Sequence, residues 1–165
     1  MLSKVITLAG GVAGAASFLQ FPEFSQQYIQ RMGGAVDELT RFVAEFDADA
    51  AELGLSREAA LVDLTAGGDM GRARAETVAG TITRHARLEA DLRALEGAGP
   101  FTRAYEMRRF SDSEIAARAW EAYKPAVPLT FEGGVFAGAG FLAGFGLIGG
   151  LMGLLRGIFR RRFSV

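Results

Sequence analysis

An uncharged stretch from Gly133 to Leu155, GGVFAGAGFLAGFGLIGGLMGLL, is longer and more apolar than a helix of a soluble domain requires. As an α-helix it would be about 34 Å long, because each residue adds about 1.5 Å along the axis. That length crosses a bilayer hydrocarbon core of about 30 Å with modest tilt. We therefore predict a glycine-rich transmembrane helix over residues 129–159 and a basic tail over residues 160–165.

The N-terminal stretch MLSKVITLAGGVAGAASFLQF has one charged side chain, that of Lys4, before an uncharged run that extends to Phe21. A cleaved signal peptide also has a basic start, an apolar run and small residues. We favour a second, short transmembrane helix over residues 1–21, with the signal peptide as the alternative. Small residues recur at helical spacing on one side of this stretch and would let another helix approach closely: Gly10, Gly14 and Ser17.

Charged residues concentrate between these two stretches. The chain has 18 Lys and Arg and 19 Asp and Glu, and every acidic residue lies between Glu23 and Glu132. This segregation lets a chain that is 50% hydrophobic, with a mean hydropathy of +0.19, carry 22% charged residues. We predict an acidic extramembrane helical domain over residues 22–128. The predicted fold class is therefore an all-α membrane protein in which two transmembrane helices flank a helical hairpin or coiled-coil domain.

Two segments of the middle region have apolar or neutral residues in alternating steps of four and three, which is typical of a coiled-coil seam. Those of the first are Met32, Val36, Leu39, Val43, Phe46, Ala50 and Leu53. Those of the second are Val78, Thr81, His85, Leu88, Leu92 and Leu95. We predict two long helices that pair as an antiparallel hairpin, either within one chain or between chains.

Capping patterns predict shorter helices in the same region. Ser56 is suited to cap a helix over Arg57–Ala66. Ser111 with Glu114 three residues later resembles a capping box, which would open another helix. Gly54 is a natural end for the first seam-bearing helix.

The second membrane stretch has two stripes of small residues. The first contains Gly133, Ala137, Gly140 and Gly144. The second contains Gly146, Gly150, Gly153 and Gly157. The stripes lie about 140° apart around a helix of 3.6 residues per turn, so neither continues the other. We expect one stripe to receive the N-terminal span and the other to receive a helix of another chain; the alternative is that glycine is merely tolerated in a membrane helix.

Positive charges lie at the outer ends of both predicted spans. Lys4 lies at the start of the first, and the end of the second carries Arg156, Arg160, Arg161 and Arg162. Lys and Arg beside a span stay on the cytoplasmic side. We therefore predict a bacterial inner-membrane protein with both termini in the cytoplasm and the central domain in the periplasm. The four arginines are expected to contact anionic lipid headgroups, with nucleic acid as a less favoured partner.

Residues suited to catalysis or metal binding are scarce. The chain has no Cys and one His, which excludes disulfides, thiolate metal sites and a cysteine nucleophile. The segment GAGFLAG at residues 138–144 has one residue too many for a GxGxxG fingerprint, and no P-loop, GxSxG or HExxH motif occurs. We predict no catalytic, cofactor-binding or metal-binding residue, no cofactor, no nucleic-acid partner, no small-molecule substrate and no enzymatic activity.

Three segments carry a resemblance to a bacterial family. They are LAGGVAGAASFLQFPEFSQQYIQRMGGAVDEL, EAYKPAVP and FEGGVFAGAGFLAGF. On these segments the chain resembles the DUF2937 family, bacterial membrane proteins of unknown function, over nearly its whole length. The resemblance implies the two-span arrangement and transfers no functional residue, because the family has no established activity.

The features together predict an interaction protein. We expect an accessory or scaffold subunit of a larger membrane complex that docks through its glycine-rich faces and its acidic domain. Its expected partners are membrane lipid and other membrane subunits or further copies of itself. The alternative is a self-assembling scaffold or a pore or transport component, which polar residues in the spans would favour; the spans offer only Thr7, Ser17 and Gln20.

Overall fold

The computed structural model describes residues 2–124 and 129–162, with side-chain surroundings for residues 3–124 and 129–156. Every element within these ranges is a helix, so the all-α fold class is confirmed for the described residues. The chain forms two compact units. Unit 1 comprises Met1–Gln26, Gly99–Tyr105 and Ala122–Val165, and unit 2 comprises Gln27–Ala98 and Glu106–Glu121.

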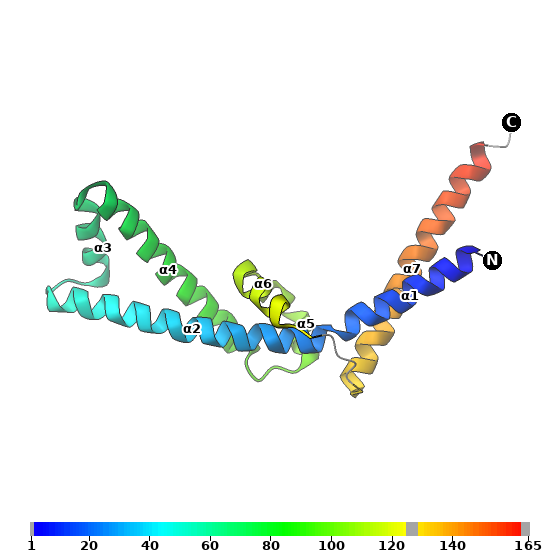
Figure 1. Cartoon of the computed structure of the whole chain (residues 1–165), viewed down its shortest axis with the longest axis horizontal. Coiled ribbons are helices and arrows are strands. Elements are labelled where there is room, and N and C mark those ends of the chain that lie inside the picture. Colours follow the sequence, from blue (N-terminus) through cyan, green and yellow to red (C-terminus); the bar gives the residue numbers. More distant parts are fainter. Residues whose placement is uncertain (1, 125–128, 163–165) are drawn as a thin grey trace. The chain divides into compact units, whose positions relative to one another are not determined.

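Unit 1 is built on two apolar helices, α1 (Leu2–Leu19) and α7 (Phe131–Arg162) (Figure 1). At about 1.5 Å per residue they are about 27 Å and about 48 Å long. The described residues contain two apolar helical windows long enough to cross a membrane, and only 11% of each window is buried. A helix that is apolar all round is either buried in a protein core or a membrane span, so the low burial favours the second.

Pro22 explains the break between α1 and the long helix α2 (Phe21–Glu52). The first helix ends at Leu19, and Gln20 forms a turn. Proline lacks a backbone N–H but is tolerated in the first turn of a helix, where that group has no partner within the helix. Pro22 is therefore accommodated in the first turn of a new helix.

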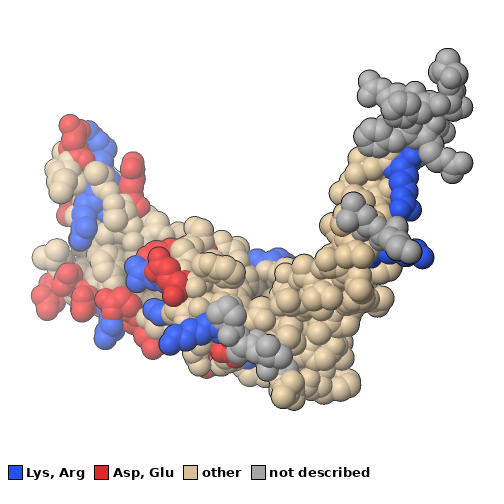
Figure 2. All heavy atoms as spheres, turned by 45° about the vertical axis from the view of Figure 1, so that its right-hand side comes forward, with Lys and Arg blue, Asp and Glu red and all other residues tan. Residues whose placement is uncertain are grey.

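Unit 2 consists of helices around a small apolar core. Its fully buried apolar residues are Tyr28, Met32, Leu88, Leu95 and Ala119. Figure 2 shows charged side chains gathered over this unit, whereas unit 1 exposes mainly uncharged ones. Besides most of α2, its elements are α3 (Arg57–Ala66), α4 (Gly68–Leu95), the 3₁₀ helix η1 (Met107–Arg109) and α6 (Ser113–Ala122).

The predicted seams are buried only in part. Their buried members are Met32, Val36, Val43, Ala50, Val78, Leu88 and Leu95, whereas Leu53 is exposed. The helices α2 and α4 diverge towards α3, which connects their far ends (Figure 1). His85 lies where the two helices approach, with its Nε2 2.9 Å from Thr40 Oγ1. A coiled-coil hairpin is therefore not confirmed.

The predicted ends of the helices around α3 are confirmed. Gly54 follows α2 with φ +69°, a conformation that L side chains rarely adopt. Ser56 caps α3, because its Oγ accepts a hydrogen bond of 3.2 Å from the N–H of Ala59. The observed helix Arg57–Ala66 has the predicted bounds.

Ser56→Ala should destabilise α3 by about 1 kcal/mol, because one N–H of the first turn loses its acceptor. Hydrogen exchange measured by mass spectrometry should show faster exchange in α3. The amides of α4 from Ala75 onward serve as the internal control and should not change. Unchanged exchange in α3 would mean that the cap contributes nothing.

The predicted capping box at Ser111 and Glu114 is wrong. The N-cap of α6 is Asp112, whose Oδ1 accepts a hydrogen bond of 3.2 Å from the N–H of Ile115. Ser111 Oγ instead accepts a hydrogen bond of 3.0 Å from Arg87 Nη1. The cap moves by one residue because the Asp112 carboxylate is held by arginines of α4, which the local pattern does not reveal.

Candidate interaction surfaces

Gly14 of α1 faces the backbone of Gly140 and Gly144 of α7, and Gly10 lies against the side chain of Ile148 and the carbonyl oxygen of Gly144. A Cβ built on Gly14 would overlap the carbonyl oxygen of Gly140, and one built on Gly144 would overlap that of Gly10. A Cβ on Gly14 would also lie 3.2 Å from the Cα of Gly144. The two backbones are therefore in direct contact, an arrangement in which Cα–H groups point at carbonyl oxygens of the other helix.

Side chains on both sides of this contact fill the space above the glycines. Gly11 lies under the ring of Phe141, because a Cβ there would be 2.7 Å from Phe141 Cε2. A Cβ on Gly140 would be 2.7 Å from the Cβ of Phe18. Positions late in α1 contact positions early in α7, so the two helices are antiparallel.

The other residues predicted for the first contact are placed as follows. Ser17 is exposed, and its Oγ donates to the carbonyl oxygen of Ala13 at 2.9 Å. Ala137 is half-buried. Gly133 is buried, and its N–H donates to Thr130 Oγ1 at 3.1 Å, which caps α7.

The second glycine stripe of α7 is open. A Cβ on Gly146, Gly150 or Gly153 would have no atom within 4 Å. Exposed leucines border this open face: Leu142, Leu147 and Leu154. The predicted member Gly157 and the headgroup candidates Arg160, Arg161 and Arg162 lie outside the residues whose side chains are described. Arg156, the remaining headgroup candidate, is exposed.

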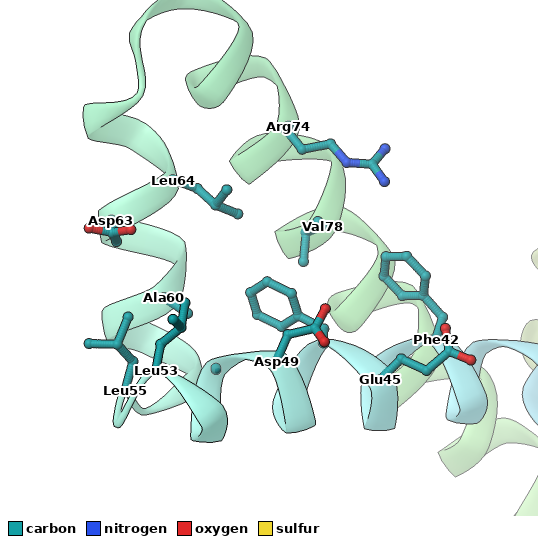
Figure 3. A pocket seen from close by; sticks show the side chains of 12 residues that line it. Phe42, Glu45, Asp49, Leu53, Leu55, Ala60, Asp63, Leu64, Arg74 and Val78 are labelled. Atoms are coloured by element: carbon teal, nitrogen blue, oxygen red, sulfur yellow. The ribbon is translucent and has the colours of Figure 1, made fainter.

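Unit 2 has a pocket of about 400 Å³ between α2, α3 and α4 (Figure 3). Its lining combines apolar side chains, such as Leu64 and Val78, with the carboxylates of Glu45, Asp49 and Asp63. None of these carboxylates has an ion-pair partner among the described residues. The lining also includes Arg74, but the three carboxylates outnumber it, so the pocket would attract cations rather than anions. No group of three or more metal-ligating side chains occurs in the described ranges.

Asp112 ties α6 to α4 and α2. Its carboxylate accepts hydrogen bonds of 3.0 Å from Arg84 Nε and 3.0 Å from Arg87 Nη2, and its side chain is only 6% exposed. Its backbone N–H donates to the hydroxyl of Tyr28 at 3.1 Å. Arg84 also pairs with Glu114 at 2.9 Å. Asp112 and Glu114 are two residues apart and both pair with Arg84. This is possible because Asp112 lies just outside the helix that contains Glu114.

The pKa values in this cluster follow from burial and hydrogen bonding. Burial alone would raise the pKa of Asp112, but the hydrogen bonds from Arg84 and from the N–H of Ile115 outweigh it and hold the pKa below the usual value. Burial raises the pKa of the Tyr28 hydroxyl. Both groups therefore keep one protonation state near neutral pH, which is suited to a structural joint.

Sequence reasoning found the glycine stripes but missed the Asp112 cluster and the pocket. The only available signal for the cluster was the pair of acidic residues near position 112, and their partners are remote in the chain. In a comparison with known families, the model described as "Protein of unknown function (DUF2937)" matches residues 2–161. No curated protein and no solved structure matches the chain.

Proposed function

The chain belongs to the DUF2937 family, and we propose that it is a non-enzymatic interaction protein of a bacterial inner membrane. In this role it serves as an accessory or scaffold subunit of a larger membrane complex. Its partners are lipid and other membrane subunits. The family description contains no activity, so the proposal rests on the surfaces of the molecule.

The open stripe of Gly146, Gly150 and Gly153 is the observation that carries the proposal. The same helix uses Gly140 and Gly144 for backbone contact with α1. Helices in lipid associate through faces of small residues, because these permit close packing. A second such face with nothing against it in the described chain is the surface where a helix of another subunit would dock.

The charges support the proposed orientation. Lys4 and Arg156 lie at the ends of α1 and α7 that are close together in an antiparallel pair. Both would be cytoplasmic by the rule that basic residues beside a span stay inside. Unit 2 would then lie in the periplasm.

Replacing both Gly150 and Gly153 by Leu should release the partner subunit while leaving membrane insertion intact. The bulky side chains would keep a docking helix from close backbone contact. The tagged full-length protein should be extracted gently from native membranes, and every retained subunit identified and quantified by mass spectrometry. Gly138→Leu is the matched control, because Gly138 also has open space around it but lies outside the stripe.

The proposal would be supported if the wild-type protein retains one partner subunit at a fixed stoichiometry and only the double variant loses that subunit. A closed ring of identical chains would instead favour the self-assembled scaffold or pore. A monomer that carries no partner in either form would contradict both.

A further inference from the structure

The short helix α5 (Pro100–Tyr105) lies beside the first turns of α7. The ring of Phe101 stacks on that of Phe136, with centroids 5.5 Å apart and planes at 14°. Phe136 also contacts Phe21, at a centroid distance of 5.4 Å. Phe136 is three residues beyond Gly133, or about 4.5 Å along the helix axis. The contact therefore places α5 at the level where the apolar stretch of α7 begins.

Arg103 of α5 has no acidic partner within the part of the chain that the structure describes. Its Nη1 donates to the Oε1 of Gln26 at 2.7 Å, while its Nε is buried without an acceptor among the described residues. The described residues give Arg103 no ion pair, and its pKa is shifted by burial with no contribution from a neighbouring carboxylate. Burial lowers the pKa of Arg103, yet a guanidinium stays charged at neutral pH. The structure thus holds a positioned cation that lacks a counter-charge.

Exposed apolar and aromatic side chains occur in the same unit near this level of α7. Tyr105 is 87% exposed and Leu129 is 96% exposed, and Phe131 opens α7 with its ring exposed. Aromatic rings with a polar edge are favoured at the boundary between hydrocarbon and headgroups. A long side chain such as that of Arg103 can keep its apolar stem in that boundary and its charge at the headgroups.

We propose that α5 is an interfacial helix and that Arg103, oriented by Gln26, binds the phosphate of an anionic phospholipid. The inference rests on the proposed membrane position of α1 and α7. A guanidinium carries further N–H donors besides the Nη1 that Gln26 engages and the buried Nε, and a lipid phosphate would supply an acceptor for them together with the missing negative charge. A lipid rather than free phosphate is the source, because the site adjoins exposed apolar side chains. The Arg103 site would lie in the leaflet opposite the one that Arg156 contacts.

Lipid retention by the purified full-length protein tests this site. Native mass spectrometry in mild detergent should compare added phosphatidylglycerol with phosphatidylcholine. We expect wild type to retain phosphatidylglycerol, and Arg103→Gln to hold one fewer molecule per chain or to bind it about tenfold more weakly, as loss of a charged hydrogen bond implies. Arg103→Lys should restore part of the binding. Arg74→Gln is the matched control, since Arg74 is an exposed arginine of unit 2.

Three outcomes would overturn the inference: equal retention of both lipids, retention unchanged in Arg103→Gln, or displacement of the lipid by inorganic phosphate alone. Alkaline carbonate extraction separates this failure from failure of the proposed function. Wild-type protein released from membranes by carbonate would contradict the membrane position itself. Protein that stays in the membrane with unchanged lipid binding in Arg103→Gln would contradict the Arg103 site only.

Discussion

Gly14→Leu should separate α1 from α7 at a cost of about 3 kcal/mol or more. Any side chain on Gly14 meets the carbonyl oxygen of Gly140, which is backbone and cannot turn aside as a side chain would. Overpacking a well-packed contact costs about 1–3 kcal/mol, and occasionally more, even where side chains can rearrange. We therefore expect loss of the helix pair rather than a local adjustment.

A disulfide between new cysteines would report the pairing, because the native chain has no Cys. The pair Thr7→Cys and Gly149→Cys is suitable, since a Cβ on Gly149 lies 3.3 Å from the Cγ2 of Thr7. Oxidation should link α1 to α7 in the otherwise native chain and fail when Gly14→Leu is added. Gly138→Leu is the control and should leave the disulfide intact. Efficient linking in the Gly14→Leu chain would show that the glycine contact does not hold the helices together.

Asp112→Ala should detach α6 from α4, with a loss of about 2–3 kcal/mol in local stability. Removing one partner of a buried ion pair leaves the other charges without compensation, which costs about 3–5 kcal/mol in a fully buried site. The lower value applies here because the side chain of Arg87 is 45% exposed. Hydrogen exchange should become faster in α6 than in the wild type. No segment of the variant should exchange more slowly than in the wild type. Asp37→Ala, at an exposed carboxylate of α2, is the control.

The same carboxylate should make α6 sensitive to acid. The pKa of Asp112 is lower in the folded protein than in the unfolded chain, so its contribution is fully present above about pH 4, the ordinary range of Asp. It is lost as the pH falls through the folded pKa, because the unfolded chain binds the proton first. Exchange rates in α6, corrected for the intrinsic effect of pH, should therefore rise below about pH 4 in wild type. A parallel rise in Asp112→Asn would assign the acid sensitivity to other groups.

The local features were predictable because the residues that cause them are neighbours in sequence. Ser56 caps α3 through an amide three residues away, and Gly54 ends α2 through its own backbone angle. Asp112 was missed for the opposite reason. Ser111 has the better local capping pattern. Asp112 caps α6 instead because Arg84 and Arg87, which lie in another helix, hold its carboxylate.

The spacing of the glycines predicts two faces of small residues on α7. It does not predict which helix packs against each face. The spacing of Gly140 and Gly144 resembles that of Gly150 and Gly153, and only the position of α1 distinguishes the first pair from the second. The heptads of α2 and α4 likewise did not predict the divergence of these helices or the pocket between them. The sequence around Arg103 does not indicate its role, because its surroundings depend on the stacking of Phe101 on Phe136, and these two rings are far apart in the sequence.

The unequal lengths of α1 and α7 would have a consequence in a lipid bilayer. At about 27 Å, α1 is shorter than a hydrocarbon core of about 30 Å, whereas α7 exceeds it. Backbone contact at Gly14 and Gly144 fixes the two helices lengthwise, so neither can slide to suit the bilayer. In a membrane the pair would therefore meet a hydrophobic mismatch of opposite sign on its two sides, with thinner lipid beside α1 and a tilted α7. Bilayer thickness would then influence where such a protein accumulates.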